Sequence, residues 1–337
     1  MSGSSRRKAL LAGALAALVS PLLAHAPATA AAPSYVALGD SYSSGTGTRS
    51  YINDGTSCQR STYAYPSLIA AARGYALNFR ACSGAKIPDV TNTQLSALTS
   101  ATNYVSISVG GNDAGFADVL TECAQPGWMS NCDGAINTAQ AFINNTLPSQ
   151  LATLYSQIRA RAPYAKVAVV GYPRIFNGED CNAFTWFSPA EESRLNQTAD
   201  LLNSRLATAA TNAGFSFANP TSRFVGHAVC DSYEWINGLS NPVSESYHPK
   251  VSGHAYGYTP TVSPVMTGAA LTVTAQVRTA AEASGDEQAA LQQTYAAADR
   301  TIEPKVFRIP DLTTRRARIA ARKAGIDLDR FIARSQR

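Results

Sequence analysis

The residue best placed for chemistry is a serine in a tight turn. Ser41 follows the apolar run Tyr35–Gly39, and the sequence becomes polar at Asp40. This pattern predicts a short buried strand that ends in a turn, where Gly39 lets the backbone bend at little steric cost. Open parallel α/β sheets bind ligands just beyond the carboxyl ends of their strands. The Ser41 hydroxyl could therefore face a cleft, although this stretch alone fits a plain serine-rich turn equally well.

Three further residues extend the pattern along the chain. Gly84 lies in the segment Ala-Cys-Ser-Gly-Ala, Asn112 follows another apolar run, and His248 precedes Pro249. Ester hydrolysis needs a nucleophile, a base and donors for the developing oxyanion. A serine, a histidine, a glycine N–H and an asparagine amide can supply these groups. Taken singly, Gly84 also fits a turn and Asn112 a helix cap.

In order and type, these four blocks resemble those of the SGNH hydrolases, also called the GDSL family of esterases and lipases. The blocks span Gly39 to Pro249, with the motifs G-x-N-D and H-P intact. One departure is Tyr42, which stands where the family name has leucine. The chain is most similar to the secreted actinobacterial members, which include lipases, esterases and phospholipase A1. The resemblance implies a three-layer α/β/α fold of flavodoxin-like type.

The resemblance also implies a role for each motif residue. Ser41 would be the nucleophile, and its own N–H, the Gly84 N–H and the Asn112 side-chain amide would form the oxyanion hole. His248 would be the base, since Pro249 biases it toward an extended conformation that can hold it over a cleft.

Two other histidines follow the first thirty residues. His227 lies in a Gly-His-Ala loop and His254 follows a glycine in a predicted helical turn. Structural roles fit both residues better than catalysis.

The group that orients His248 has two candidates. The family commonly has an aspartate three residues before the histidine, and here that position is Glu245. Some secreted actinobacterial members use a main-chain carbonyl two residues before it, which here belongs to Ser246. Because the chain resembles that subgroup, we expect the Ser246 carbonyl to hold the imidazole, and we keep Glu245, which is one methylene longer than aspartate, as the alternative.

Charge is spread unevenly over the 337 residues. The net charge is +5, with +3 at residues 6–8 and +7 at residues 300–337, which leaves −5 for the rest. A mildly acidic body offers no basic face for nucleic acid. Hydrolysis by a serine needs neither a metal nor an organic cofactor, and we expect a monomer that acts on a lipid or small ester.

Residues 1–30 have the three parts of a secretory signal peptide. Arg6-Arg7-Lys8 is the basic region, residues 9–23 are apolar, and Ala28-Thr29-Ala30 is a small-residue cleavage site. A membrane anchor is the alternative, but the apolar stretch is short and interrupted by Ser20 and Pro21. We therefore expect cleavage before Ala31, secretion, and no transmembrane segment.

All six cysteines follow the predicted cleavage site. An even number of cysteines in an exported chain indicates disulfides. Metal binding is the alternative, but the sequence contains no C-x-x-C motif of the kind that metal sites use. The count alone leaves fifteen connectivities open. The family resemblance implies that neighbours pair as Cys58–Cys82, Cys123–Cys132 and Cys181–Cys230.

Apolar runs predict a parallel sheet of about five strands with helices on both faces. The strands are expected at residues 35–39, 77–81, 104–109, 166–170 and 215–218. Helices are expected at 65–72, from 89, at 136–162, from 189, and briefly at 251–256. Residues 116–132 are expected to be a loop.

The composition changes at about residue 269, from which the chain is rich in alanine and glutamine and then basic. We assign residues 31–268 to an SGNH hydrolase domain and residues 269–337 to an extension that is partly helical or disordered. A solvated tail is favoured over attachment to an anionic surface. The domain is expected to fold and retain activity without the extension.

These features predict a secreted serine carboxylic-ester hydrolase. Its expected substrates are lipid-like esters, either acylglycerols or phospholipid acyl chains. The aromatic residues expected to line an acyl groove, if they do not simply pack, are Phe184, Trp186, Phe187 and Trp235. A carbohydrate acetylesterase on the same fold and a non-catalytic binding module are the alternatives.

Overall fold

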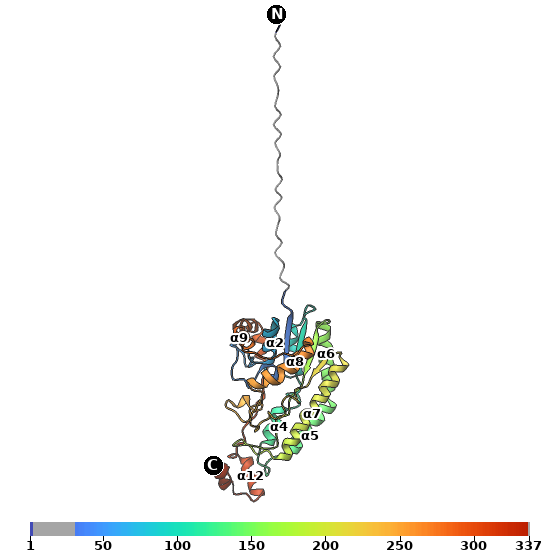
Figure 1. Cartoon of the computed structure of the whole chain (residues 1–337). Coiled ribbons are helices and arrows are strands. Elements are labelled where there is room, and N and C mark those ends of the chain that lie inside the picture. Colours follow the sequence, from blue (N-terminus) through green and yellow to red (C-terminus); the bar gives the residue numbers. More distant parts are fainter. Residues whose placement is uncertain (3–30, 336–337) are drawn as a thin grey trace. The chain divides into compact units, whose positions relative to one another are not determined.

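Figure 1 shows the computed structural model, which describes residues 1–2 and 31–335. All but the first two residues of the predicted signal peptide lie outside the described residues. The chain divides into two units, Met1–Ala31 and Ala32–Arg337, and the fold described below belongs to the second.

The centre of that unit is a sheet of five parallel strands in the order β2-β1-β3-β4-β5. The strands are β1 (Ser34–Gly39), β2 (Ala76–Phe79), β3 (Tyr104–Ser108), β4 (Lys166–Val170) and β5 (Ser216–Ala218). Each overlaps its predicted range, and the predicted three-layer α/β/α architecture is confirmed. Neighbours β1 and β3 pair so that Gly39 lies opposite Ser108. The residues after these two strands therefore emerge side by side at one edge of the sheet.

Helices cover both faces of the sheet. Helix α8 (Thr259–Thr267) packs on β4 and β5 beside α2 (Tyr65–Arg73), and α7 (Pro189–Asn212) packs on the same strands beside α6 (Leu147–Arg161) (Figure 1). The other helices before residue 269 are α1 (Ser41–Ser44), α3 (Ile87–Asp89), α4 (Phe116–Cys123) and α5 (Cys132–Asn145). Short 3-10 or π turns occupy Val90–Gln94, Leu95–Ala97, Val243–Glu245 and Gly253–Tyr258.

Two helical segments differ from the prediction. Residues 116–123, which we expected in a loop, form α4, which begins after Gly115 in the left-handed conformation (φ +82°). The single helix expected at 136–162 is two helices, α5 and α6, that meet at Thr146. Pro148 lies in the first turn of α6, where its missing N–H costs no helical hydrogen bond, so the second helix starts there.

The six cysteines form the three pairs that the family resemblance implies. The pairs are Cys58–Cys82, Cys123–Cys132 and Cys181–Cys230. The first joins the loop before α2 to the segment after β2, close to Gly84. The second joins the end of α4 to the start of α5.

The extension is helical and packs on the rest of the unit. It contains α9 (Ala275–Ala283), α10 (Gly285–Gln293), α11 (Ala296–Asp299), α12 (Arg315–Lys323) and α13 (Leu328–Ser335). Helix α9 lies against α2 (Figure 1), and α10 lies against β2. Leu271 and Ala281 share a small apolar core with Leu68 of α2. The packed extension contrasts with the solvated tail that its composition favoured, while a domain boundary at residue 268 remains a prediction.

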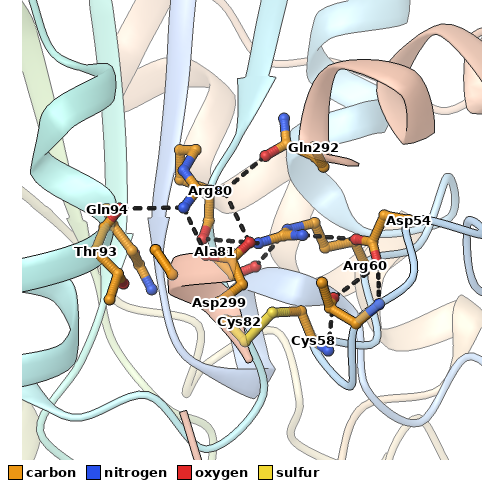
Figure 2. Close-up of polar contacts among 12 residues, drawn as sticks. Asp54, Cys58, Arg60, Arg80, Ala81, Cys82, Thr93, Gln94, Gln292 and Asp299 are labelled. Atoms are coloured by element: carbon orange, nitrogen blue, oxygen red, sulfur yellow. Dashed lines mark hydrogen bonds and ion pairs between the residues drawn. A yellow bond between two sulfur atoms is a disulfide. The ribbon is translucent and has the colours of Figure 1, made fainter. Parts of the chain in front are cut away.

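A buried ion cluster ties the extension to the sheet (Figure 2). Asp299, at the end of α11, lies 2.6 Å from both Arg60 and Arg80, and none of the three side chains is exposed. Arg60 also pairs with Asp54 at 2.6 Å and donates to the Ala81 carbonyl at 2.9 Å. A buried charge is costly unless it is paired. Arg60 can pair with Asp54, but Arg80 has Asp299 as its anionic partner among the described residues, so the extension supplies the negative charge that Arg80 needs.

Candidate active site

Ser41 is the first residue of α1, directly after β1. Its position is fixed by Asp40, whose carboxylate accepts hydrogen bonds from Tyr42 N (3.1 Å), Ser108 Oγ (2.7 Å) and Tyr172 Oη (2.5 Å). Burial raises the pKa of Asp40 to about 6, although these hydrogen bonds lower it. Asp40 therefore organises the turn, and in the described part of the chain its carboxylate makes no hydrogen bond to the His248 ring or the Ser41 hydroxyl.

His248 lies within hydrogen-bond distance of Ser41. Its Nε2 is 2.9 Å from Ser41 Oγ, and its Nδ1 is 2.9 Å from the Ser246 carbonyl oxygen. A carbonyl can only accept, so Nδ1 carries the hydrogen and the Nε2 lone pair faces the serine hydroxyl. Burial lowers the pKa of His248 to about 4. The imidazole is therefore neutral near pH 7 and able to accept a proton.

Tyr42, where the family name has leucine, supports the segment that carries His248. Its hydroxyl donates to the Tyr247 carbonyl at 2.7 Å, and its ring lies 5.3 Å from the His248 ring. Tyr247 has a positive φ of 62°, which costs energy in a residue with a large side chain. Tyr42 thus helps to hold a strained turn, a role that the sequence motif did not reveal.

The Glu245 carboxylate is bound by side chains other than that of His248. It accepts from Tyr51 Oη at 2.6 Å and lies 3.4 Å from Arg49 Nε, and the side chain is only 1% exposed. No hydrogen bond joins the Glu245 and His248 side chains in the part of the chain that the structure describes. This geometry favours the Ser246 carbonyl as the group that orients the imidazole.

We expect Glu245→Gln to reduce kcat by less than about tenfold, whereas loss of a true triad carboxylate costs about ten-thousandfold. Glutamine can still accept from Tyr51, and the Ser246 carbonyl survives any side-chain change. The measurement is kcat and KM on a soluble ester, with thermal unfolding run alongside. Glu282→Gln is the matched control, because Glu282 also accepts from a tyrosine, Tyr63, at 2.7 Å. A thousandfold loss in a folded Glu245→Gln protein would restore Glu245 as the acid.

The three expected oxyanion donors surround one pocket. Gly84 has a φ of +82°, in a turn after β2, and Asn112 Nδ2 donates one hydrogen to the Ala85 carbonyl at 3.1 Å, which leaves its second hydrogen free. Neither the Ser41 nor the Gly84 N–H donates to another group among the described residues. Ser41, Gly84, Asn112 and His248 all line this pocket, which we call the catalytic pocket. The arrangement can stabilise negative charge beside a serine nucleophile.

The other two histidines lie elsewhere. His227 stacks on Trp235 with ring centres 3.7 Å apart, and its Nδ1 is 2.7 Å from the Tyr233 carbonyl. His254 is buried beside Tyr65, and burial lowers its pKa to about 3. Neither side chain lines the catalytic pocket, so their geometry fits structural roles.

A second, apolar pocket also reaches Ser41, and Ser41, Asn112 and Phe116 line both pockets. Helices α4, α5 and α7 form its walls. Its apolar side chains include Phe116, Val119, Leu120, Ile143, Leu195, Ala199 and Leu202. We call this the acyl pocket, because it can hold a hydrocarbon chain whose carbonyl lies at Ser41.

The aromatic residues expected to line an acyl groove are wrongly placed for that role. Phe187 is buried against Phe176, Trp186 lies beside Phe331, and Trp235 stacks on His227. None of these three residues lines the acyl pocket, and neither does Phe184, which is exposed. The residues of α4 that line this pocket were not predicted to do so, because residues 116–132 were expected to be a loop. The pair Val119-Leu120 one turn after Phe116 was the available signal.

The described residues, 1–2 and 31–335, contain neither a metal-binding cluster nor a membrane-spanning helix. No group of three His, Cys, Asp or Glu side chains in these ranges could hold a metal ion. Likewise, no helix in them is both long enough and apolar enough to cross a bilayer.

Comparisons with known proteins match both the sequence and the fold. A family model described as the GDSL-like lipase/acylhydrolase family matches residues 37–256. A lipase from Streptomyces rimosus is 44% identical over 266 residues, which is 76% of this chain and 97% of that protein. Lipase 1 from Streptomyces coelicolor is 44% identical over 264 residues, or 77% of this chain and 96% of that protein.

Two solved structures agree with these relatives. The extracellular lipase from S. rimosus superposes with a TM-score of 0.66 at 43% identity, covering 69% of this chain and 100% of that one. Phospholipase A1 from Streptomyces albidoflavus gives a TM-score of 0.65 at 43% identity, covering 68% and 98%. The fold and these matches define a carboxylic-ester hydrolase. Within that class, the chain belongs to the GDSL-like lipase/acylhydrolase family, the SGNH hydrolases that its motifs resemble.

Proposed function

We propose that the protein is a secreted serine esterase or lipase that uses a Ser41–His248 dyad and an oxyanion hole of Ser41, Gly84 and Asn112. The observation that carries this proposal is the 2.9 Å contact between Ser41 Oγ and His248 Nε2, with Nδ1 held by the Ser246 carbonyl. The extracellular S. rimosus relative and the pattern at residues 1–30 support secretion. N-terminal sequencing of exported protein, expected to begin at Ala31, tests that part.

The reaction proceeds in two halves. His248 Nε2 takes the Ser41 proton as Oγ attacks the ester carbonyl, and the oxyanion receives hydrogen bonds from the two main-chain N–H groups and the Asn112 amide. His248 then gives the proton to the leaving alcohol, and an acyl-enzyme remains on Ser41. A water molecule, deprotonated by His248, attacks the acyl group and releases the acid and the free serine.

The acyl pocket supports lipid-like substrates, namely acylglycerols or phospholipid acyl chains. Burial of hydrocarbon contributes about 0.8 kcal/mol per methylene, so an apolar pocket favours long chains over acetate. The relatives named lipase and phospholipase A1 agree with this choice. An enzyme specific for acetyl groups on carbohydrate would have no use for such a pocket.

A p-nitrophenyl ester series from acetate to palmitate tests the substrate class. We expect kcat/KM to rise with chain length, and Ala199→Phe on α7 to lower kcat/KM for long chains by about tenfold or more relative to acetate. Phenylalanine there would fill part of the acyl pocket. Ala190→Phe, at an exposed position of the same helix, is the matched control. Activity on acetate alone, indifferent to Ala199→Phe, would favour the carbohydrate acetylesterase.

A further inference from the structure

After α11, the extension crosses the catalytic pocket. Residues 303–309, which we call the strap, have no regular secondary structure. Four of them line the catalytic pocket together with Ser41 and His248, and these are Pro304, Lys305, Val306 and Phe307. The family match ends at residue 256, so this wall of the pocket is additional to the family core.

The strap touches the oxyanion loop at Gly84. A Cβ added to Gly84 would lie 2.3 Å from the Pro304 Cα, far inside van der Waals contact. Only a glycine therefore fits between the loop and the strap as they stand. The strap consequently closes the pocket directly beside one of the proposed oxyanion donors.

The middle of the strap is fixed to α4 and to the histidine segment. Lys305 Nζ pairs with Asp118 at 2.6 Å, and the Arg308 N–H donates to Thr121 Oγ1 at 3.0 Å. The Phe307 ring is 5% exposed and meets the Tyr247 ring edge-on at 5.0 Å. Tyr247 directly precedes His248.

Both ends of the strap are fixed as well. Before it, Asp299 is held in the buried ion cluster (Figure 2). After it, Arg316 of α12 pairs with Glu122 of α4 at 2.7 Å, and Leu312 and Ala317 pack with Met129. A segment held at both ends and in the middle acts as a wall and not as a mobile flap.

The chemistry decides which half of the ester meets this wall. His248 must deliver its proton to the leaving alkoxide, so the alcohol half lies on the His248 side of Ser41. His248 lines the catalytic pocket but not the acyl pocket. The acyl chain and the alcohol therefore occupy different pockets, and the strap bounds only the one for the alcohol.

We propose that the strap is a specificity element for the alcohol half of the ester, and that it limits the width of the alcohol group next to the ester oxygen. This inference rests on the proposed serine mechanism and adds a determinant that lies outside the family core. Lys305 and Val306 are the most accessible of the four residues that line the pocket, since the Lys305 side chain is 64% exposed and Val306 is 43% exposed.

The experiment compares methyl octanoate with benzyl octanoate, which share an acyl chain and differ in alcohol size. Lys305→Ala/Val306→Ala should raise the benzyl-to-methyl ratio of kcat/KM by about fivefold or more, and Val306→Trp should lower it by a similar factor. Arg322→Ala, at an exposed position of α12 in the same extension, is the matched control and should leave the ratio unchanged. The octanoate-to-butyrate ratio, measured as methyl esters, should stay the same in all variants, because the acyl pocket is untouched.

The two opposed variants make the result decisive. A ratio that stays within twofold in both, or that moves in the same direction in both, overturns the strap as a specificity element. A change of the octanoate-to-butyrate ratio equal to the benzyl-to-methyl change would show a general distortion of the site and would also overturn it. Failure of the unaltered protein to hydrolyse either ester is a different result, and removes the proposed function itself.

Discussion

Ser41→Ala is expected to lower kcat for ester hydrolysis by roughly a millionfold, the scale seen when a serine hydrolase loses its nucleophile. No acyl-enzyme can form without Oγ, and His248 then has no proton to take. The fold should be unaffected, because in the described part of the chain the Ser41 hydroxyl bonds only to His248. The measurements are kcat on p-nitrophenyl octanoate and the free energy of unfolding in urea.

Ser44→Ala is the matched control for this experiment. Ser44 lies on the same short helix and its hydroxyl donates to the Ser41 carbonyl at 3.3 Å, away from the imidazole. The Ser44→Ala variant should have a kcat within about tenfold of that of the unaltered protein. If Ser41→Ala turned over at a comparable rate, the serine mechanism would have to be abandoned.

Asp299→Ala should lower the free energy of unfolding by about 3–5 kcal/mol, as expected when one member of a buried charge cluster is removed. Two arginines and two aspartates balance in the intact cluster, and loss of Asp299 leaves an unpaired positive charge with no exposed surface. Arg80 is most affected, because Asp54 still pairs with Arg60. Urea denaturation measures the loss, and Asp286→Ala, at an exposed position of α10, should change stability by less than about 0.5 kcal/mol.

A second substitution makes the prediction sharper. Adding Arg80→Met to Asp299→Ala restores the balance of charge, so the double variant should be more stable than Asp299→Ala alone. If Asp299→Ala costs less than about 1 kcal/mol, or if Arg80→Met makes it worse, the charge argument fails. Independent folding of residues 31–268 stays a prediction, and the same reasoning leads us to expect a chain that ends at residue 268 to be less stable than the whole chain, since it lacks Asp299.

The motif residues and the sheet could be predicted from the sequence for one physical reason. Ser41 and Asn112 each follow a buried apolar run, and neighbouring parallel strands deliver such residues to the same edge. β1 and β3 are indeed neighbours. A local apolar run therefore predicts both the strand itself and the edge of the sheet at which the residue after it lies.

The extension could not be predicted in the same way. Asp299 meets Arg60 and Arg80 across 239 and 219 residues of sequence, and a single aspartate at the end of an alanine-rich helix gives no local sign of a buried partner. Likewise, nothing in Pro304–Phe307 indicates contact with Gly84. Hydrophobic periodicity predicts which face of a helix or strand is buried. It does not predict which distant segment covers that face, because that depends on the completed fold.

The buried ion cluster also has a consequence for biosynthesis. Ribosomes make the chain from its N-terminus, so Arg60 and Arg80 are synthesised long before their shared counter-ion. Domains generally fold in order of synthesis, but here the first sheet strands cannot bury these arginines at low cost until α11 exists. We expect completion of the core to be delayed until nearly the whole chain has been made. We therefore expect a nascent chain with this property to stay unfolded longer, and a prematurely terminated chain to be cut by proteases more readily than the whole chain.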